Sequence, residues 1–140
     1  MENEPVLVDT GPLIALYESK DLHHNMCREQ AKLLPVGKAY TCWPVLTEAA
    51  YRLRRYPVKR SKLFQAVRDE IYVLLPLGAR DMVDIEAVFQ TYHDQEVDLA
   101  DACLVHLANR EQITKIFTLD RRHFGVYRMA NGRPFELLPH

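Results

Sequence analysis

Short apolar runs alternate with longer amphipathic segments along most of the chain. The runs that predict strands are 5–9, 39–42, 72–75 and 115–118. Helices are expected at 13–18, 25–34, 44–55, 58–70, 79–93 and from about Val97 to about Gln112, and the tail 124–139 is expected to add a last strand or two. Strands that alternate with helices in this way predict an α/β domain with a parallel sheet.

The segment that begins at Val97 is the most apolar of the expected helices. After Asp98 nearly every residue up to Ala108 is apolar or small, which predicts a helix buried on almost all sides. Asp98 and Asp101 lie three residues apart near its start and therefore on roughly one face. Capping and the helix dipole explain Asp98 better than Asp101, which lies a turn deeper. An ionised carboxylate buried there costs several kcal/mol, in order of magnitude, unless a cation or hydrogen-bond donors meet it.

Three further acids are expected near the same place. Asp9 and Asp120 each end an apolar strand, and ligand sites in open parallel sheets form beyond the carboxyl ends of the strands. Glu48 is on a helix whose apolar stripe faces inward. Four converging acids would repel one another, but with one or two divalent ions they form an oxygen site suited to magnesium or manganese. The absence of a His or Cys cluster argues against zinc, and no Ser or Cys stands beside a base as a nucleophile would.

Composition restricts the protein class without identifying it. A chain of 140 residues predicts one domain, 1–140, and 48% hydrophobic with 26% charged residues is ordinary for a soluble globular protein. The net charge of −1 means that any nucleic-acid contact must come from a local patch. Three widely spaced cysteines predict buried free thiols in a reducing compartment. With no leader and no long apolar run, we expect a cytoplasmic protein that does not span a membrane.

Basic and aromatic side chains near these acids are candidate nucleic-acid contacts. Basic residues follow Glu48 closely, and two more stand next to Asp120; the candidates for phosphate binding are Arg52, Arg55, Arg121 and Arg122. A solvated helical face is the alternative for the run after Glu48. Trp43, Tyr51 and Tyr56 could stack on bases, although packing in the core or in a dimer interface is favoured for each. For His123 a structural role is favoured over RNA contact or proton donation.

Four blocks of the sequence contain the candidate acids, namely 7–16, 47–51, 98–108 and 118–124, and a further block follows at 132–139. Together these blocks resemble the motifs of PIN-domain ribonucleases, and in particular those of the VapC-type toxins of bacterial and archaeal toxin–antitoxin pairs. The resemblance implies a five-stranded parallel sheet with helices on both faces, a homodimer, and an antitoxin partner. It also implies that Mg²⁺ or Mn²⁺ is held by acids and that an activated water cleaves an RNA phosphodiester. The implied metal ligands are Asp9, Glu48, Asp101 and Asp120, with Thr10 and Thr118 supporting them and Asp98 as an auxiliary acid.

One departure and two alternatives accompany this resemblance. Gly11-Pro12 stands where many family members have Ser-Ala, which removes a hydroxyl near the metal. One alternative is a PIN-domain nuclease of RNA processing that is not a toxin. The other is a non-catalytic α/β module, such as a phospho-receiver or a degenerate PIN domain. A receiver normally has paired acids after its first strand, whereas Thr10 and Gly11 follow Asp9, and a degenerate domain would have lost one of the four acids. The nuclease is therefore favoured.

Overall fold

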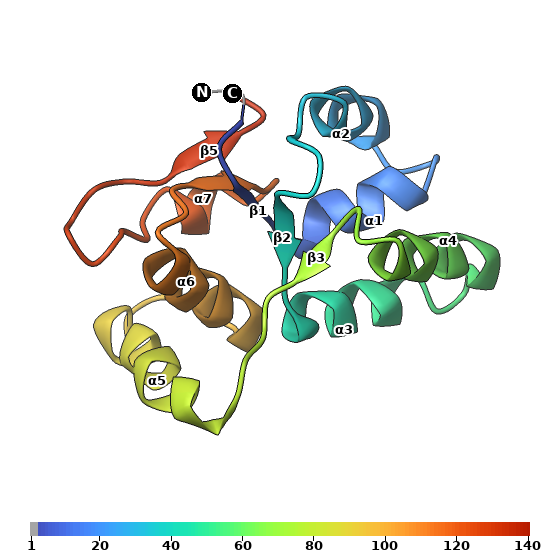
Figure 1. The fold of residues 1–140 in the computed structure, drawn as a ribbon. Coiled ribbons are helices and arrows are strands. Elements are labelled where there is room, and N and C mark those ends of the chain that lie inside the picture. Colours follow the sequence, from blue (N-terminus) through green and yellow to red (C-terminus); the bar gives the residue numbers. More distant parts are fainter. Residues whose placement is uncertain (1–2) are drawn as a thin grey trace.

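A computed structural model describes residues 3–140 and contains one parallel sheet. Its strands are β1 (Val6–Val8), β2 (Ala39–Thr41), β3 (Val73–Leu74), β4 (Lys115–Phe117) and β5 (Glu136–Leu138). They lie in the order β3-β2-β1-β4-β5, and every neighbouring pair is parallel (Figure 1). In the central strand β1, Leu7 pairs with Tyr40 of β2 and with Ile116 of β4. The predicted α/β fold with a five-stranded parallel sheet is confirmed.

Helices flank the sheet on both sides. The first group is α1 (Thr10–Tyr17), α2 (His24–Ala31), α3 (Trp43–Arg52) and α4 (Pro57–Arg68). The second is α5 (Met82–Thr91), α6 (Leu99–Glu111) and the short α7 (Arg121–Phe124). The two groups occupy opposite halves of the molecule in Figure 1. Right-handed crossovers account for this division, because the chain moves outward from β1 through β2 to β3 and then returns past β1 to β4 and β5.

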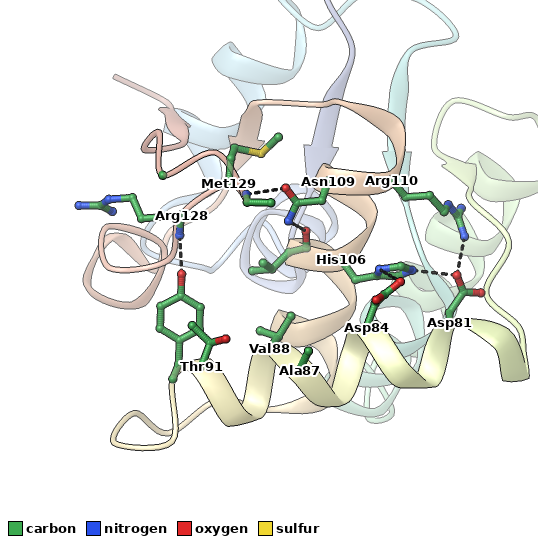
Figure 2. Close-up of a pocket in the computed structure, with 14 residues that line it drawn as sticks. Asp81, Asp84, Ala87, Val88, Thr91, His106, Asn109, Arg110, Arg128 and Met129 are labelled. Atoms are coloured by element: carbon green, nitrogen blue, oxygen red, sulfur yellow. Dashed lines mark hydrogen bonds and ion pairs between the residues drawn. The ribbon is translucent and has the colours of Figure 1, made fainter.

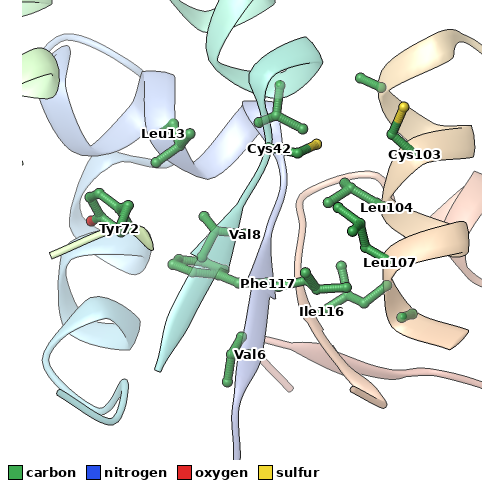
Figure 3. Close-up of a cluster of buried hydrophobic side chains, with 14 of the residues drawn as sticks. Val6, Val8, Leu13, Cys42, Tyr72, Cys103, Leu104, Leu107, Ile116 and Phe117 are labelled. Atoms are coloured by element: carbon green, nitrogen blue, oxygen red, sulfur yellow. The ribbon is translucent and has the colours of Figure 1, made fainter. Parts of the chain in front are cut away.

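The core lies between the sheet and these helices (Figure 3). All three residues of β1 are buried, as are Ile116 and Phe117 of β4. Helix α6 is buried from Ala100 to Ala108, as its apolar sequence predicts; only its first residue, Leu99, is exposed before that stretch. The three cysteines are free thiols and are buried, which also agrees with the sequence.

Several element boundaries differ from the expected ones. Helix α1 begins at Thr10, three residues early, because Asp9 caps it and Pro12 is accommodated in its first turn. The segment 79–93 divides into a 3-10 turn, η1 (Ala79–Asp81), and α5. Helix α3 ends at Arg52 instead of Arg55, where the Arg54 amide bonds the Tyr51 carbonyl in a turn. The tail supplies a single strand, β5, and α7 was not expected.

Of the two packing sites expected for Trp43, Tyr51 and Tyr56, the core or a dimer interface, the structure excludes the core. Their exposed fractions are 62%, 58% and 44% respectively. All three lie on α3 or in the turn that follows it, so an aromatic character at these positions does not mark a buried helix face. In the part of the chain that the structure describes, no helix is long and apolar enough to cross a membrane.

The topology brings two strand ends together at the centre of the sheet. Strand order reverses at β1, because β2 and β3 lie to one side of it and β4 and β5 to the other. Beyond the carboxyl ends of β1 and β4 the loops therefore diverge and leave a crevice, which is where ligands bind in open α/β sheets. Asp9 directly follows β1, and Asp120 follows β4 by three residues.

Candidate functional site

An acidic pocket of about 370 Å³ opens at this crevice. It is lined by Asp9, Thr10, Gly11, Glu48, Arg52, Asp98, Asp101, Leu119 and Asp120. The five carboxylates come from four separate parts of the chain: the end of β1, helix α3, the start of α6 and the loop after β4. Arg52 is the single basic side chain among these lining residues. Carboxylates distant in the sequence thus share one pocket, as the strand-end positions predicted.

Asp9 is fixed from two directions at the bottom of the pocket. Its Oδ1 accepts a hydrogen bond of 2.7 Å from the Thr10 amide, so that Asp9 caps α1. Its Oδ2 accepts one of 2.7 Å from the hydroxyl of Thr118, which is fully enclosed just after β4. The side chain is 7% exposed, and burial raises the pKa of Asp9 to about 6, although both hydrogen bonds oppose the rise. The carboxylate is therefore oriented but costly to ionise.

Asp98 and Asp101 play different parts at the start of α6. Asp98 is exposed and caps the helix, since its Oδ1 accepts a 2.8 Å hydrogen bond from the Asp101 amide. Asp101 is 8% exposed, and its Oδ2 accepts a 2.8 Å hydrogen bond from the buried hydroxyl of Tyr127. Burial, followed by repulsion from Asp98, raises the pKa of Asp101 to about 8. The predicted capping by Asp98 is confirmed, and Asp101 is the acid whose charge most needs a counter-ion.

Asp120 is held by the short helix that follows it. Its Oδ1 accepts a 3.0 Å hydrogen bond from the His123 amide, and its Oδ2 lies 2.8 Å from Nδ1 of the His123 ring. The Asp120 amide in turn donates to the hydroxyl of Thr118 at 3.0 Å. Since that hydroxyl donates to Asp9, Thr118 links the acids of two neighbouring strands. His123 has the structural contact that the sequence favoured.

Glu48 forms the more open wall of the pocket. It is partly exposed on α3, one turn before Arg52, whose Nη1 lies 3.8 Å from its Oε1. The hydroxyl of Thr10 approaches Oε2 at 3.4 Å, which is a long hydrogen bond. Glu48 is thus weakly held and free to move towards a bound group.

The structure brings only one of the four candidate arginines to the pocket. Arg52 lines it. The structure also describes Arg55, Arg121 and Arg122, and none of these three lines the pocket. Arg121 instead donates a 2.7 Å hydrogen bond to the Pro139 carbonyl near the end of the chain. Adjacency to Asp120 in the sequence therefore does not bring Arg121 and Arg122 into the lining of the pocket, and their contact with RNA phosphate stays a prediction.

Tyr127 is the residue at this site that the sequence did not reveal. It is fully buried and packs edge-to-face on Tyr92 and Phe124, with ring centroids 5.0 and 5.1 Å apart. The segment 124–139 shows no hydrophobic period, so nothing in it indicated an inward-facing hydroxyl. The contact between His123 and Asp120 had a signal, namely their spacing of three residues.

The donors around this pocket suit a hard divalent cation. Among residues 3–140, no group of three or more His, Cys, Asp or Glu side chains is arranged so that these side chains alone could hold a metal ion. Mg²⁺, however, usually keeps several waters and binds through one or two carboxylates together with substrate phosphates. Asp9 and Asp101 offer that arrangement, since both are buried and acidic neighbours raise the pKa of each. A cation would relieve this repulsion.

A larger pocket, of about 730 Å³, lies elsewhere, between α5, α6 and the loop at 128–132 (Figure 2). Its polar centre is Asp81, whose Oδ1 accepts hydrogen bonds from His106 at 2.8 Å and from Arg110 at 3.2 Å. The Arg110 side chain also donates to the Pro76 carbonyl at 2.7 Å, which ties the loop before α5 to α6. These polar groups are already paired, so the smaller acidic pocket is the better candidate for chemistry.

Comparison with known proteins agrees with this geometry. The family model of the PIN domain matches residues 6–129. The chain belongs to the PIN-domain family. The chain is 28% identical over 141 residues to Ribonuclease VapC26 of Mycobacterium tuberculosis (strain ATCC 25618 / H37Rv), and the match covers 96% of this chain and the whole of that protein. The resemblance inferred from the four sequence blocks is confirmed.

A solved structure supports the fold of the PIN domain. The crystal structure of VapC20 from Mycobacterium tuberculosis, a Sarcin-Ricin loop cleaving toxin, superposes with a TM-score of 0.75. The match covers 84% of this chain and 91% of that one at 17% sequence identity. At this identity the likeness establishes a common architecture, and the substrate of VapC20 is not transferred to this chain.

Proposed function

We propose that this PIN domain is an endoribonuclease that depends on a divalent cation, Mg²⁺ or Mn²⁺, and that it is the toxin of a toxin–antitoxin pair. The observation that supports the activity best is the meeting of five carboxylates at the crevice between β1 and β4. Membership of the PIN family and the likeness to a ribonuclease over nearly the whole chain point to RNA as the substrate.

The metal ligands in this proposal are Asp9, Glu48, Asp101 and Asp120. When bound, a divalent cation supplies charge for the scissile phosphate and lowers the pKa of a water molecule. Thr118 holds Asp9, and the hydroxyl of Thr10 makes a weak contact with Glu48. Asp98 is an auxiliary acid that raises the negative potential beside Asp101.

The remaining side chains position the acids and the RNA. Tyr127 orients Asp101 through a buried hydrogen bond, and His123 orients Asp120. Arg52 lines the pocket beside Glu48, where its guanidinium can donate two parallel hydrogen bonds to one RNA phosphate. The buried part of α6 keeps Asp101 in place when substrate binds, because a helix packed from Ala100 to Ala108 cannot shift easily.

Cleavage of total cellular RNA by the purified protein tests the activity. Wild-type protein with Mg²⁺ or Mn²⁺ is expected to cut, and a chelator, Asp9→Asn and Asp101→Asn are each expected to abolish cutting while circular dichroism stays unchanged. Asp94→Asn is the matched control, since Asp94 is exposed and outside the pocket. Cleavage that survives both pocket substitutions would contradict the proposal. Mapping the fragment ends identifies the RNA and the site that is cut.

The biological role is a separate part of the proposal. We propose that the protein acts in the cytoplasm as a homodimer, restrained by a small antitoxin protein. Induced expression should then arrest growth, and co-expression of the antitoxin should relieve the arrest. Normal growth despite an active purified enzyme would favour a PIN-domain nuclease of RNA processing. Absence of any cleavage, with RNA still bound, would favour a non-catalytic module.

A further inference from the structure

One face of α3 carries large aromatic side chains that are more than half exposed. Trp43 and Tyr51 are 62% and 58% exposed. They lie eight residues apart, with Thr47 between them, so the three share one side of the helix. The hydroxyl of Thr47 donates a hydrogen bond of 2.8 Å to the Trp43 carbonyl one turn earlier. The aromatic face, as we call Trp43, Thr47 and Tyr51, is therefore an apolar strip about two turns long.

This aromatic face borders the acidic pocket. Glu48 and Arg52 each follow one member of the face by a single position, and both line the pocket. Helix α3 also begins directly after β2, at the same edge of the sheet as Asp9 and Asp120. A chain whose phosphate lay in the pocket would meet this face as it left.

The segment that follows the aromatic face in the sequence is strongly basic. From Arg52 to Lys62 there are six basic residues and no acidic one, although the whole chain has a net charge of −1. The Arg54 guanidinium lies 4.1 Å from the centre of the Tyr51 ring. The Lys59 ammonium, which is ion-paired with Glu18 at 2.8 Å, lies 4.9 Å from the centre of the Tyr56 ring. Exposed rings interleaved with cations combine the two requirements for binding single strands, which are stacking platforms and phosphate contacts.

We propose that the aromatic face of α3 binds unpaired bases of the RNA next to the cleaved phosphate, by stacking on Trp43 and Tyr51. The inference rests on the proposed ribonuclease function and makes its substrate a single-stranded segment. Bases in a duplex are already stacked on one another and cannot offer their faces to these rings. Arg52 and Arg54 contact the backbone on either side of the stacked bases.

Fluorescence gives a direct reading, because Trp43 is the single tryptophan of the chain. A chelator prevents cleavage while a single-stranded RNA of about ten nucleotides is titrated in and its binding is followed by anisotropy. Trp43 emission is expected to be quenched in step with binding, whereas the same sequence in a duplex should leave it unchanged. Binding of single-stranded RNA with constant emission would overturn the proposal.

Substitutions provide a second reading. Tyr51→Ala and Trp43→Ala are each expected to weaken binding by between about 5-fold and about 150-fold, and in cleavage assays the loss should appear mainly in KM. Tyr51→Phe, which keeps the ring, should retain the affinity. Val83→Ala is the control, because Val83 is an exposed apolar residue of α5, which belongs to the other group of helices. Wild-type affinity in both alanine variants would also overturn the proposal.

The outcomes separate this inference from the proposed function. Unchanged cleavage and KM in Tyr51→Ala and Trp43→Ala would refute the stacking surface and leave the ribonuclease intact. Quenching by RNA without any cleavage by the wild type would refute the ribonuclease and leave the surface. A Trp43 emission that changes with protein concentration in the absence of RNA, together with sedimentation as a dimer, would assign this face to a second copy and contradict stacking on RNA.

Discussion

The hydroxyl of Tyr127 donates a 2.8 Å hydrogen bond to Oδ2 of Asp101, and both side chains are buried. Tyr127 follows α7, so this one bond joins the segment after β4 to the first turn of α6. It opposes the rise in the pKa of Asp101 that burial and Asp98 produce. The orientation of Asp101, the acid in the pocket whose pKa is raised most, therefore depends on a residue outside every sequence motif.

Tyr127→Phe should consequently weaken the site without changing the fold. Loss of a partner that orients a metal ligand typically costs about 10-fold to about 100-fold in metal affinity or activity. We expect a loss of this size in Mn²⁺ affinity by calorimetry and in RNA cleavage. The control is Tyr92→Phe, which removes a hydroxyl that accepts from the Arg128 amide, away from the acids. Equal effects of the two substitutions would show that Tyr127 acts only through packing.

The acidic pocket should make the metal-free protein less stable as the pH rises. The folded-state pKa values of Asp9, about 6, and Asp101, about 8, lie above the usual value near 3.8. The folded protein therefore holds protons that the unfolded chain releases, and its unfolding free energy falls from about pH 4 to about pH 8. Urea unfolding in a chelator measures this fall. Asp101→Asn should be more stable than wild type at about pH 8, and a flat wild-type profile would refute the charge burial.

Asp81 should have the opposite effect on the pH dependence of stability, because its ionised form stabilises the folded protein. Hydrogen bonds from the Gly78 amide and from His106 lower the pKa of Asp81 to about 2. Its stabilising effect is thus complete above the usual value near 3.8 and is lost as the pH falls through about 2. Thermal unfolding of wild type and Asp81→Asn should differ most above about pH 4 and converge near pH 2. A constant difference over that range would mean that the ionised carboxylate is not what stabilises the loop before α5.

Arg52 and Arg121 should differ in their effect on RNA. Arg52 lines the pocket, whereas Arg121 is bonded to the Pro139 carbonyl. Arg52→Ala is expected to weaken RNA binding and to reduce the slope of log affinity against log salt by about 0.7, the value for one lost phosphate contact on a single strand. Arg121→Ala should leave that slope unchanged. The reverse result would place the RNA path over α7.

The sequence predicted the features of this fold that depend on local pattern. Asp9 and Asp120 could be located because each ends an apolar run, and the burial of α6 follows from its composition. Tyr127 could not be located, because its hydrogen bond to Asp101 spans 26 residues and the segment around it shows no hydrophobic periodicity. For Trp43 and Tyr51 the sequence favours packing in the core or in a dimer interface, and the structure excludes only the core, because hydropathy alone does not separate an exposed aromatic face from a core one.

The central claim is that the carboxylates at the crevice between β1 and β4 form one divalent-cation site and that RNA cleavage requires the cation bound there. Titration of Mn²⁺ into wild type, Asp9→Asn, Asp101→Asn and Asp94→Asn, with cleavage measured on the same samples, tests it most directly. The account predicts that affinity and cleavage fall together in the two pocket variants and that Asp94→Asn matches wild type. Wild-type Mn²⁺ affinity in both pocket variants, or cleavage that persists in them, would contradict it.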